Sequence, residues 1–193
     1  MVVRSRLASH EEPEVSRTLR GVFAEEGIRV IPRATVSSVT PDRDTGEVVA
    51  TVTGPGGQDT LRAGRLMVAV GRRPVTENLG LGSVGVDTGA RGEILVDARM
   101  ATSNPKVWAA GDVTGHPQYV YVASAHGVTA VENAFHHTGQ QIDYTHLPRV
   151  TFTSPAIAAV GMTDQQAREA GLRCECRVRA LEAGPQAVVK PDP

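Results

Sequence analysis

The stretch that decides the fold is Val107-Trp108-Ala109-Ala110-Gly111-Asp112, a short apolar run that stops at a glycine and an aspartate. An earlier run, Leu66-Met67-Val68-Ala69-Val70-Gly71, also stops at a glycine. In an open α/β sheet, ligands bind beyond the carboxyl ends of the strands, where glycine lets a backbone approach a nucleotide and a carboxylate can accept hydrogen bonds from hydroxyl groups. The two runs therefore predict an α/β fold with a nucleotide site at the strand ends.

The rest of the chain alternates between helical and β patterns. Helical spacing of apolar residues predicts an amphipathic helix over residues 14–26, ended by Gly27. A second helix is predicted over residues 120–138, rich in small residues that permit close packing, and a capping-box pattern, Thr163-Asp164-Gln165-Gln166, opens a short third helix. β-rich runs between turn residues predict strands; these cover residues 28–31, 35–39, 47–53, 60–61, 66–70, 94–97, 107–110, 150–152 and 156–161. The run 66–70 is continuously apolar, which is typical of a strand buried on both faces.

Composition excludes several classes of partner. Basic and acidic residues nearly cancel, 20 against 21, so the sequence indicates neither nucleic-acid binding nor attraction to an anionic membrane surface. The apolar runs are too short to span a bilayer, and Met1 is not followed by a secretory leader pattern. The two cysteines, Cys174 and Cys176, are too few for a disulfide framework, which favours a reducing, cytoplasmic location.

One glycine pattern is misleading. Gly80-Leu81-Gly82-Ser83-Val84-Gly85 has the spacing of a dinucleotide-binding turn. That turn needs a strand before it and a helix after it, so that a pyrophosphate sits at the helix N-terminus. Arg73-Pro74 precedes the pattern and Gly89 follows shortly after it, so we interpret it as a loop.

Four short motifs are shared with a known family: Ala69-Val70-Gly71-Arg72-Arg73-Pro74, Asn78-Leu79-Gly80-Leu81, Ala101-Thr102-Ser103 and Ala109-Ala110-Gly111-Asp112. Through them the chain resembles the class I pyridine nucleotide-disulfide oxidoreductases, which include lipoamide dehydrogenase and glutathione reductase. Within this family it is most similar to the mercuric reductases, over about residues 1–183. That similarity rests on three further stretches: residues 117–125, 152–161 and 174–177.

The resemblance implies a division into FAD/NAD(P)-binding, Rossmann-like three-layer domains, both partial, and the start of an α+β dimerisation domain. Residues 1–75 would be the C-terminal part of the NAD(P)-binding domain, and residues 76–145 the C-terminal part of the FAD-binding domain. Residues 146–193 would begin the interface domain of a homodimer. Both ends look cut, and the last ten residues depart from the family pattern, so we expect an internal fragment.

The resemblance also implies roles for residues at the flavin. Asp112, next to Gly111, would accept hydrogen bonds from the ribityl chain of FAD. The backbone of Val120 would meet the pyrimidine side of the isoalloxazine at a helix N-terminus, where partial positive charge stabilises a reduced, anionic flavin by about 1 kcal/mol.

Further residues are implied at the nicotinamide nucleotide. Gly71 would lie against it. Arg4 and Arg6, after a strand end, are candidates to pair with a 2′-phosphate, which favours NADPH over NADH; the alternative is that both are solvated. Neither Cys174 nor Cys176 has the flanking ligands of a metal site, and the histidines, His126 among them, are expected to serve packing or solvation.

The implied activity is the reduction of Hg(II) to Hg(0) by NADPH through FAD and a cysteine pair. The sequence contains no Cys-x-x-x-x-Cys pair and no N-terminal dinucleotide fingerprint, and we assign no catalytic residue. We therefore expect the chain alone neither to reduce mercury nor to retain FAD tightly. Two alternatives stay open: a dihydrolipoamide dehydrogenase-like disulfide reductase, and a non-catalytic nucleotide-binding remnant.

Overall fold

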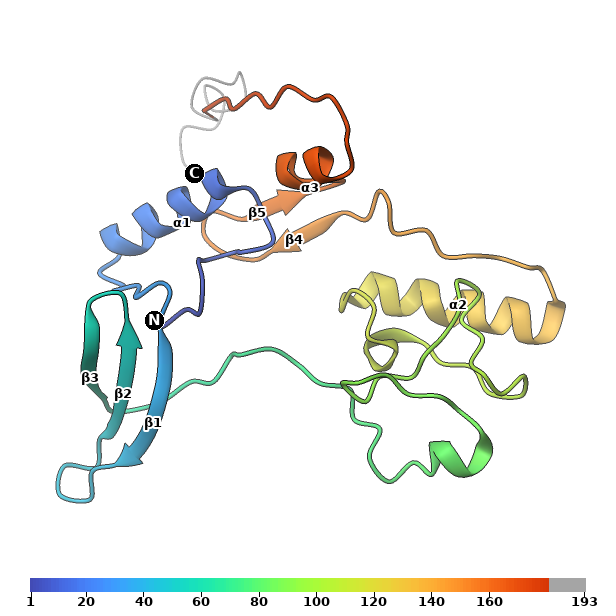
Figure 1. The fold of residues 1–193 in the computed structure, drawn as a ribbon, viewed down its shortest axis with the longest axis horizontal. Coiled ribbons are helices and arrows are strands. Elements are labelled where there is room, and N and C mark those ends of the chain that lie inside the picture. The colour runs from blue at the N-terminus through green and yellow to red at the C-terminus, as the bar shows by residue number, and fades with distance from the viewer. Residues whose placement is uncertain (181–193) are drawn as a thin grey trace. The chain divides into compact units, whose positions relative to one another are not determined.

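The computed structural model describes residues 1–180 and divides into two compact units (Figure 1). Unit 1 combines residues 1–68 with the segment that starts at Thr145, and unit 2 is Ala69–Tyr144. Over the described part of the chain, no helix has the length and apolar character needed to cross a membrane. The expectation about the last ten residues lies outside the described residues.

Unit 1 begins with the predicted amphipathic helix, α1 (Pro13–Glu25). Pro13 occupies the first turn, where its fixed φ suits a helix and its missing N–H removes no bond. Leu19 and Ser16 are buried on one face, and the Ser16 hydroxyl donates to the Leu7 carbonyl. Gly27, with φ of +76°, ends the helix as predicted, and the Ile28 amide returns to the Phe23 carbonyl.

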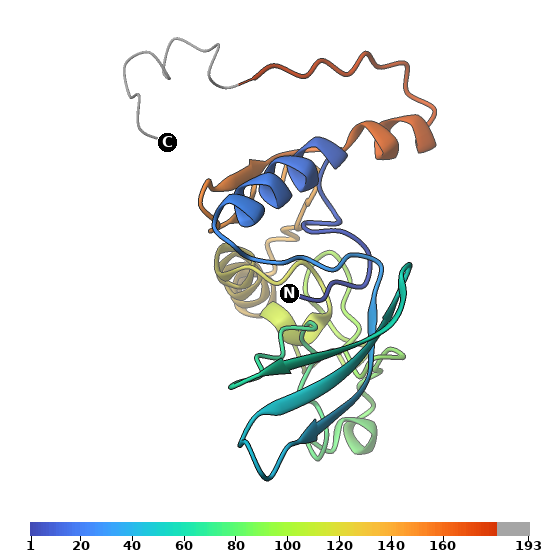
Figure 2. The same ribbon diagram turned by 90° about the vertical axis from the view of Figure 1, so that its left-hand side faces the viewer.

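A three-stranded antiparallel meander follows α1: β1 (Thr35–Pro41), β2 (Val48–Gly54) and β3 (Gly57–Ala63). Figure 2 shows the three strands as one twisted sheet. Val52, only 1% exposed, anchors the central strand, while β1 and β3 are largely exposed. The predicted meander is confirmed, except that residues 28–31 contribute only a single bridge, Val2 to Ile31.

The remainder of unit 1 is a short hairpin and a helix: β4 (Arg149–Thr151), β5 (Ile157–Ala159) and α3 (Asp164–Glu169). The predicted capping box is present, because the Thr163 hydroxyl accepts from the Gln166 amide and the Gln166 side chain accepts from the Thr163 amide. Arg149 forms a two-point ion pair with Glu11, at 3.1 Å for both contacts, which ties β4 to the loop before α1.

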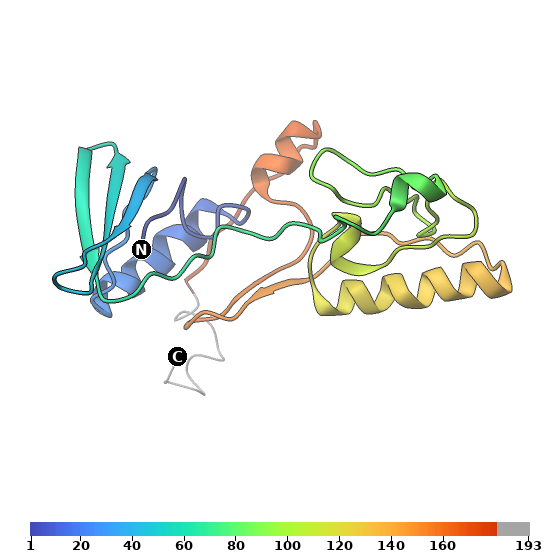
Figure 3. The same ribbon diagram turned by 90° about the horizontal axis from the view of Figure 1, so that it is seen from below.

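Unit 2 contains two short 3-10 turns, η1 (Leu81–Val84) and η2 (Gly111–Thr114), and one long helix, α2 (Val120–His136). Its small core contains Val86, Ile94 and Ala109. Figure 3 shows the loops of the unit along one side of α2. The misleading glycine pattern is confirmed as a loop, because η1 is a single 3-10 turn between two left-handed glycines.

Three predicted strands are wrong as regular strands. Residues 66–70 have no strand partner among the described residues and are exposed, with Met67 at 89% and Val70 at 91%. Residues 94–97 and 107–110 form only isolated bridges, Thr88 to Ile94 and Ala101 to Trp108. An apolar run becomes a strand only when a neighbouring strand accepts and donates its backbone bonds, and residues 1–180 supply none here.

Candidate functional site at the Gly111–Asp112 turn

The site is built around Gly111, the first residue of η2 in unit 2. Its φ of +78° lies in the region that glycine adopts freely. A Cβ at this position would lie 3.2 Å from the Cβ of Ala123 on α2. The Thr114 hydroxyl donates to the Gly111 carbonyl at 2.7 Å. Both the backbone conformation and the close approach of α2 therefore favour glycine at this position.

The Gly111 amide is bonded to a side chain on α2. It donates to Nδ1 of His126 at 3.1 Å, and Nε2 of His126 lies 2.6 Å from the hydroxyl of Tyr144. The ring of His116 stacks on Tyr144, with ring centres 5.0 Å apart, and meets His126 edge-on at 5.7 Å. His126 is completely buried. This cluster closes the inner side of the turn.

Burial sets the protonation of this cluster. It lowers the pKa of His126 below the usual value, and the neighbouring His116 lowers it further. Burial also lowers the pKa of His116 and raises the pKa of Tyr144. All three groups are therefore held in their neutral forms at neutral pH.

On the outer side of the turn, the carboxylate of Asp112 stays accessible, with 46% of its side chain exposed. One guanidinium nitrogen of Arg72 lies 3.1 Å from it, and another donates to the Gln118 carbonyl at 2.9 Å. An exposed pair of this kind contributes little to stability. Its effect is to orient the carboxylate toward the segment that leads into α2.

The N-terminus of α2 completes the site. Tyr119 precedes the helix and provides no side-chain cap, so amides of the first turn have no capping side chain. Val120, the first helical residue, is 88% exposed. An anion or a polar ring edge placed here would meet backbone N–H donors and the positive end of the helix dipole.

The arrangement fits the flavin contacts that the sequence suggests. Asp112 can accept hydrogen bonds from hydroxyl groups, Gly111 lets the turn lie close against α2, and the amide end of α2 at Val120 can face an anionic ring edge. All three lie within unit 2. Gly71, in the same unit, has φ of +111° and open space where a Cβ would be, so it leaves room for a ligand.

Arg4 and Arg6 differ in their surroundings, because Arg6 is held by hydrogen bonds and Arg4 is exposed. Arg6 donates to the Ser16 hydroxyl at 3.0 Å and to the carbonyls of Ser9 and Glu11 at 3.1 and 2.8 Å. Arg4 is exposed and makes no side-chain hydrogen bond or ion pair with the described residues that would hold it in place. Arg6 thus braces the loop before α1, and Arg4 remains available to an anion.

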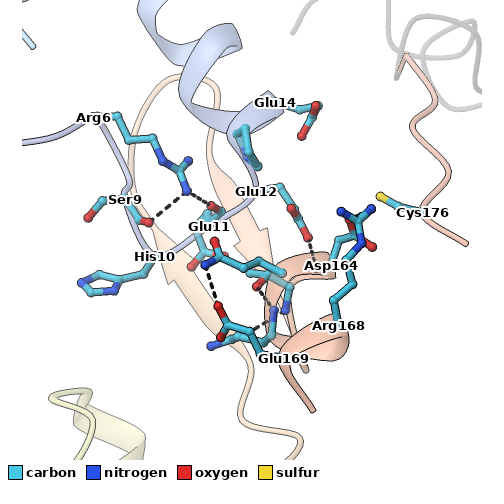
Figure 4. A pocket seen from close by; sticks show the side chains of 14 residues that line it. Arg6, Ser9, His10, Glu11, Glu12, Glu14, Asp164, Arg168, Glu169 and Cys176 are labelled. Atoms are coloured by element: carbon cyan, nitrogen blue, oxygen red, sulfur yellow. Dashed lines mark hydrogen bonds and ion pairs between the residues drawn. The ribbon is translucent and has the colours of Figure 1, made fainter. Parts of the chain in front are cut away.

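Figure 4 shows the pocket beside Arg6, a cavity of about 740 Å³ between the start of α1 and α3. Its lining includes several carboxylates: Glu11, Glu12, Glu14, Asp164 and Glu169. The Glu12 carboxylate accepts from the Asp164 amide at 2.6 Å. So much negative charge opposes a phosphate, which makes Arg6 a poor partner for one.

The two cysteines near α3 are free and exposed. The thiol of Cys174 lies 3.4 Å from the Asp164 carboxylate, and that hydrogen bond raises the pKa of Cys174. Partial desolvation and nearby carboxylates raise the pKa of Cys176. Raised values disfavour the thiolate that binds metals. Over residues 1–180, no cluster of three or more His, Cys, Asp or Glu residues is arranged to hold a metal ion.

The family model of the pyridine nucleotide-disulphide oxidoreductases matches residues 1–127, and the model of their dimerisation domain matches residues 147–193. The chain therefore belongs to the pyridine nucleotide-disulphide oxidoreductase family. Membership implies binding of FAD and NAD(P)H. The predicted fold class and family are confirmed, while the domain boundaries and the site residues remain predictions.

Among individual relatives, the chain is 52% identical to the mercuric reductase of Streptomyces lividans over 192 residues, covering 100% of this chain and 40% of that protein. It is 39% identical to the mercuric reductase of Bacillus cereus over 184 residues, covering 95% and 29%. The chain thus spans two fifths or less of these curated relatives.

Two solved structures share the fold. The HOCl-induced flavoprotein disulfide reductase RclA from Escherichia coli matches with a TM-score of 0.82 and 27% identity, over 99% of this chain and 43% of that one. LpdA from Mycobacterium tuberculosis matches with a TM-score of 0.81 and 27% identity, over 94% and 38%.

The His126–Gly111 contact was missed by sequence reasoning, which assigned His126 to packing or solvation. Packing is half correct, because the ring is buried, but its Nδ1 also accepts a hydrogen bond from the Gly111 amide in the turn. The two residues are 15 positions apart, and Arg72 and Asp112 are 40 apart. The one local signal is a histidine within a helix that is rich in small and apolar residues.

Proposed function

We propose that the chain forms part of a flavoprotein oxidoreductase that uses NADPH and FAD to reduce Hg(II) to Hg(0). The observation that carries the proposal is the 52% identity to a mercuric reductase along the whole chain, combined with a flavin-compatible turn at Gly111–Asp112. The match to the dimerisation domain supports a homodimer. A cytoplasmic location belongs to the same proposal, because exposed free thiols such as Cys174 persist in reducing compartments.

In this proposal each residue has a binding or orienting task. The Asp112 carboxylate accepts hydrogen bonds from the ribityl hydroxyl groups, and Arg72 keeps that carboxylate directed toward the start of α2. The backbone amides at Val120 face the pyrimidine edge of the flavin. Gly71 lets the nicotinamide nucleotide approach, and Arg4 is the candidate for pairing with its 2′-phosphate.

The chemistry that FAD supplies when bound is acceptance of hydride from NADPH and delivery of electrons to a dithiol. This chain contributes no dithiol, because its two cysteines are one residue apart and lie near α3 in unit 1. Its share of the work is to hold and orient the cofactors.

The test is a chimera in which this chain replaces the aligned segment of the Streptomyces lividans mercuric reductase. We expect the chimera to bind FAD and to oxidise NADPH in the presence of Hg(II) with release of Hg(0). Reduction of lipoamide instead of Hg(II) would favour the disulfide-reductase alternative. A folded chimera without FAD would contradict the proposal.

A charge-matched pair of variants tests the site within the chimera. Asp112→Asn should weaken FAD binding about 10- to 100-fold, because hydrogen bonds to a charged acceptor contribute about 1.5–3 kcal/mol each. Asp87→Asn, an exposed aspartate of the same unit, removes the same charge and should leave FAD binding unchanged. Equal effects of the two variants would remove Asp112 from the site.

A further inference from the structure

The hydrogen bond between Gly111 and His126 determines which nitrogen of the imidazole carries the proton. A backbone N–H can only donate, so Nδ1 of His126 must present its lone pair to the Gly111 amide at 3.1 Å. In a neutral imidazole the proton then lies on Nε2. That nitrogen donates to the Tyr144 hydroxyl at 2.6 Å. The cluster therefore selects a single tautomer of His126.

The hydrogen bond from Gly111 to His126 fixes the backbone next to Asp112, and His126 contributes no atom to the surface of the site. His126 has no exposed area, whereas the adjacent Asp112 carboxylate is half exposed. With Thr114 bonded to the Gly111 carbonyl, both polar backbone groups of Gly111 are held by side chains. A turn fixed in this way has little freedom to redirect the next side chain.

We propose that His126 is a positioning residue for the flavin site: its Nδ1 fixes the Gly111 amide and thereby the direction of Asp112, while Tyr144 accepts the Nε2 proton of the tautomer that the Gly111 contact selects. The proposal rests on the function proposed above for Asp112. A buried histidine that only fills space is the competing explanation. The positioning role requires a hydrogen-bond acceptor at the δ position of the side chain, whereas space filling does not.

Two substitutions separate these explanations in the 193-residue chain. His126→Asn retains an acceptor close to the place of Nδ1 but loses the group that reaches Tyr144. His126→Gln carries its amide at the ε position and loses the acceptor for Gly111. His136→Asn is the matched control, because His136 is exposed in the last turn of the same helix.

The readout is the hydrogen-exchange protection of the Gly111 amide, measured by NMR and normalised for the intrinsic pH dependence of exchange. We expect protection to fall about tenfold in His126→Gln, to be largely kept in His126→Asn and to be unchanged in His136→Asn. Long-range 1H–15N spectra of the wild type should show Nδ1 unprotonated and Nε2 protonated. Equal protection in the Asn and Gln variants, or a protonated Nδ1, would overturn the proposal.

The pH dependence of Gly111 amide protection in the wild type tests the proposal even if a variant fails to fold. Protonation of Nδ1 removes the acceptor, so Gly111 protection in the wild type should fall as His126 becomes cationic. The titratable groups that face the imidazole are His116 and Tyr144. Protection that stays constant through the titration of His126 would contradict the proposal. None of these readouts requires FAD, so failure of the proposed function and failure of this inference are distinguishable.

Discussion

Gly111→Ala should destabilise unit 2 for two reasons, the left-handed backbone of the turn and the close approach of α2. The backbone at φ +78° disfavours any Cβ by about 1–2 kcal/mol. The new Cβ would also lie 3.2 Å from the Ala123 Cβ, and crowding of this kind adds about 1 kcal/mol. We expect a loss of about 2–3 kcal/mol in the free energy of unfolding of unit 2.

The control is Gly139→Ala. Gly139 has nearly the same conformation, φ +72°, but open space where its Cβ would be. It should therefore cost only the backbone part, about 1–2 kcal/mol. Urea unfolding followed by Trp108 fluorescence is a suitable assay, because Trp108 is the only tryptophan of the chain and lies in unit 2.

A double variant isolates the contact. Ala123→Gly removes the methyl group that a new Cβ would meet, although it costs about 1 kcal/mol itself in a helix interior. In a double-mutant cycle, the pair Gly111→Ala with Ala123→Gly should be less destabilising than the sum of the single variants by about 1 kcal/mol. Additive effects, or equal losses in Gly111→Ala and Gly139→Ala, would refute the close approach of α2 to the turn.

Three further predictions concern both units. Arg149→Lys loses the two-point contact with Glu11 and should lower the free energy of unfolding of unit 1 by about 1–3 kcal/mol. Arg29→Lys, in an exposed pair, should change it by less than about 0.5 kcal/mol. Hydrogen exchange in α1 measures both effects, and equal losses would refute the distinction. Thr163→Ala should cost about 1 kcal/mol locally, seen as faster exchange of the Gln166 amide, and unchanged exchange would argue against the capping box. The pKa of His126 is lower in the folded than in the unfolded state, so the unfolded state binds more protons as the pH falls. The free energy of unfolding of unit 2 should therefore be greatest above about pH 6.5 and should decline from there toward the folded-state pKa. Urea midpoints measured from Trp108 fluorescence between pH 5 and 8 test this, and a rise in stability on acidification would reverse the assigned sign.

The sequence predicted what depends on neighbouring residues along the chain. The capping box at Thr163, the left-handed end of α1 at Gly27 and the meander of β1 to β3 all follow from local patterns. Their signals lie within a few residues of the elements that they define. The predicted bounds of α1 and α2 lie within one or two residues of the observed bounds.

Features that need a distant partner were missed or wrong. The apolar run at residues 66–70 predicted a buried strand, but strand formation requires a neighbour that the described residues do not provide. The contact between Gly111 and His126 and the pair between Arg72 and Asp112 join positions that no local pattern relates. The carboxylate and the glycine of the site were identified from motif resemblance, whereas the groups that hold them came only from the structure.

The two side-chain bonds to the Gly111 backbone have a consequence for how this sequence can diverge. Helical and sheet bonds survive most substitutions because they join backbone to backbone, but this turn depends on the identity of the residues at positions 114 and 126. Loss of the acceptor at 126 leaves a buried amide unsatisfied, which is costly enough to be selected against. Among related sequences, we therefore expect positions 111, 114, 126 and 144 to be inherited as a set and to change together.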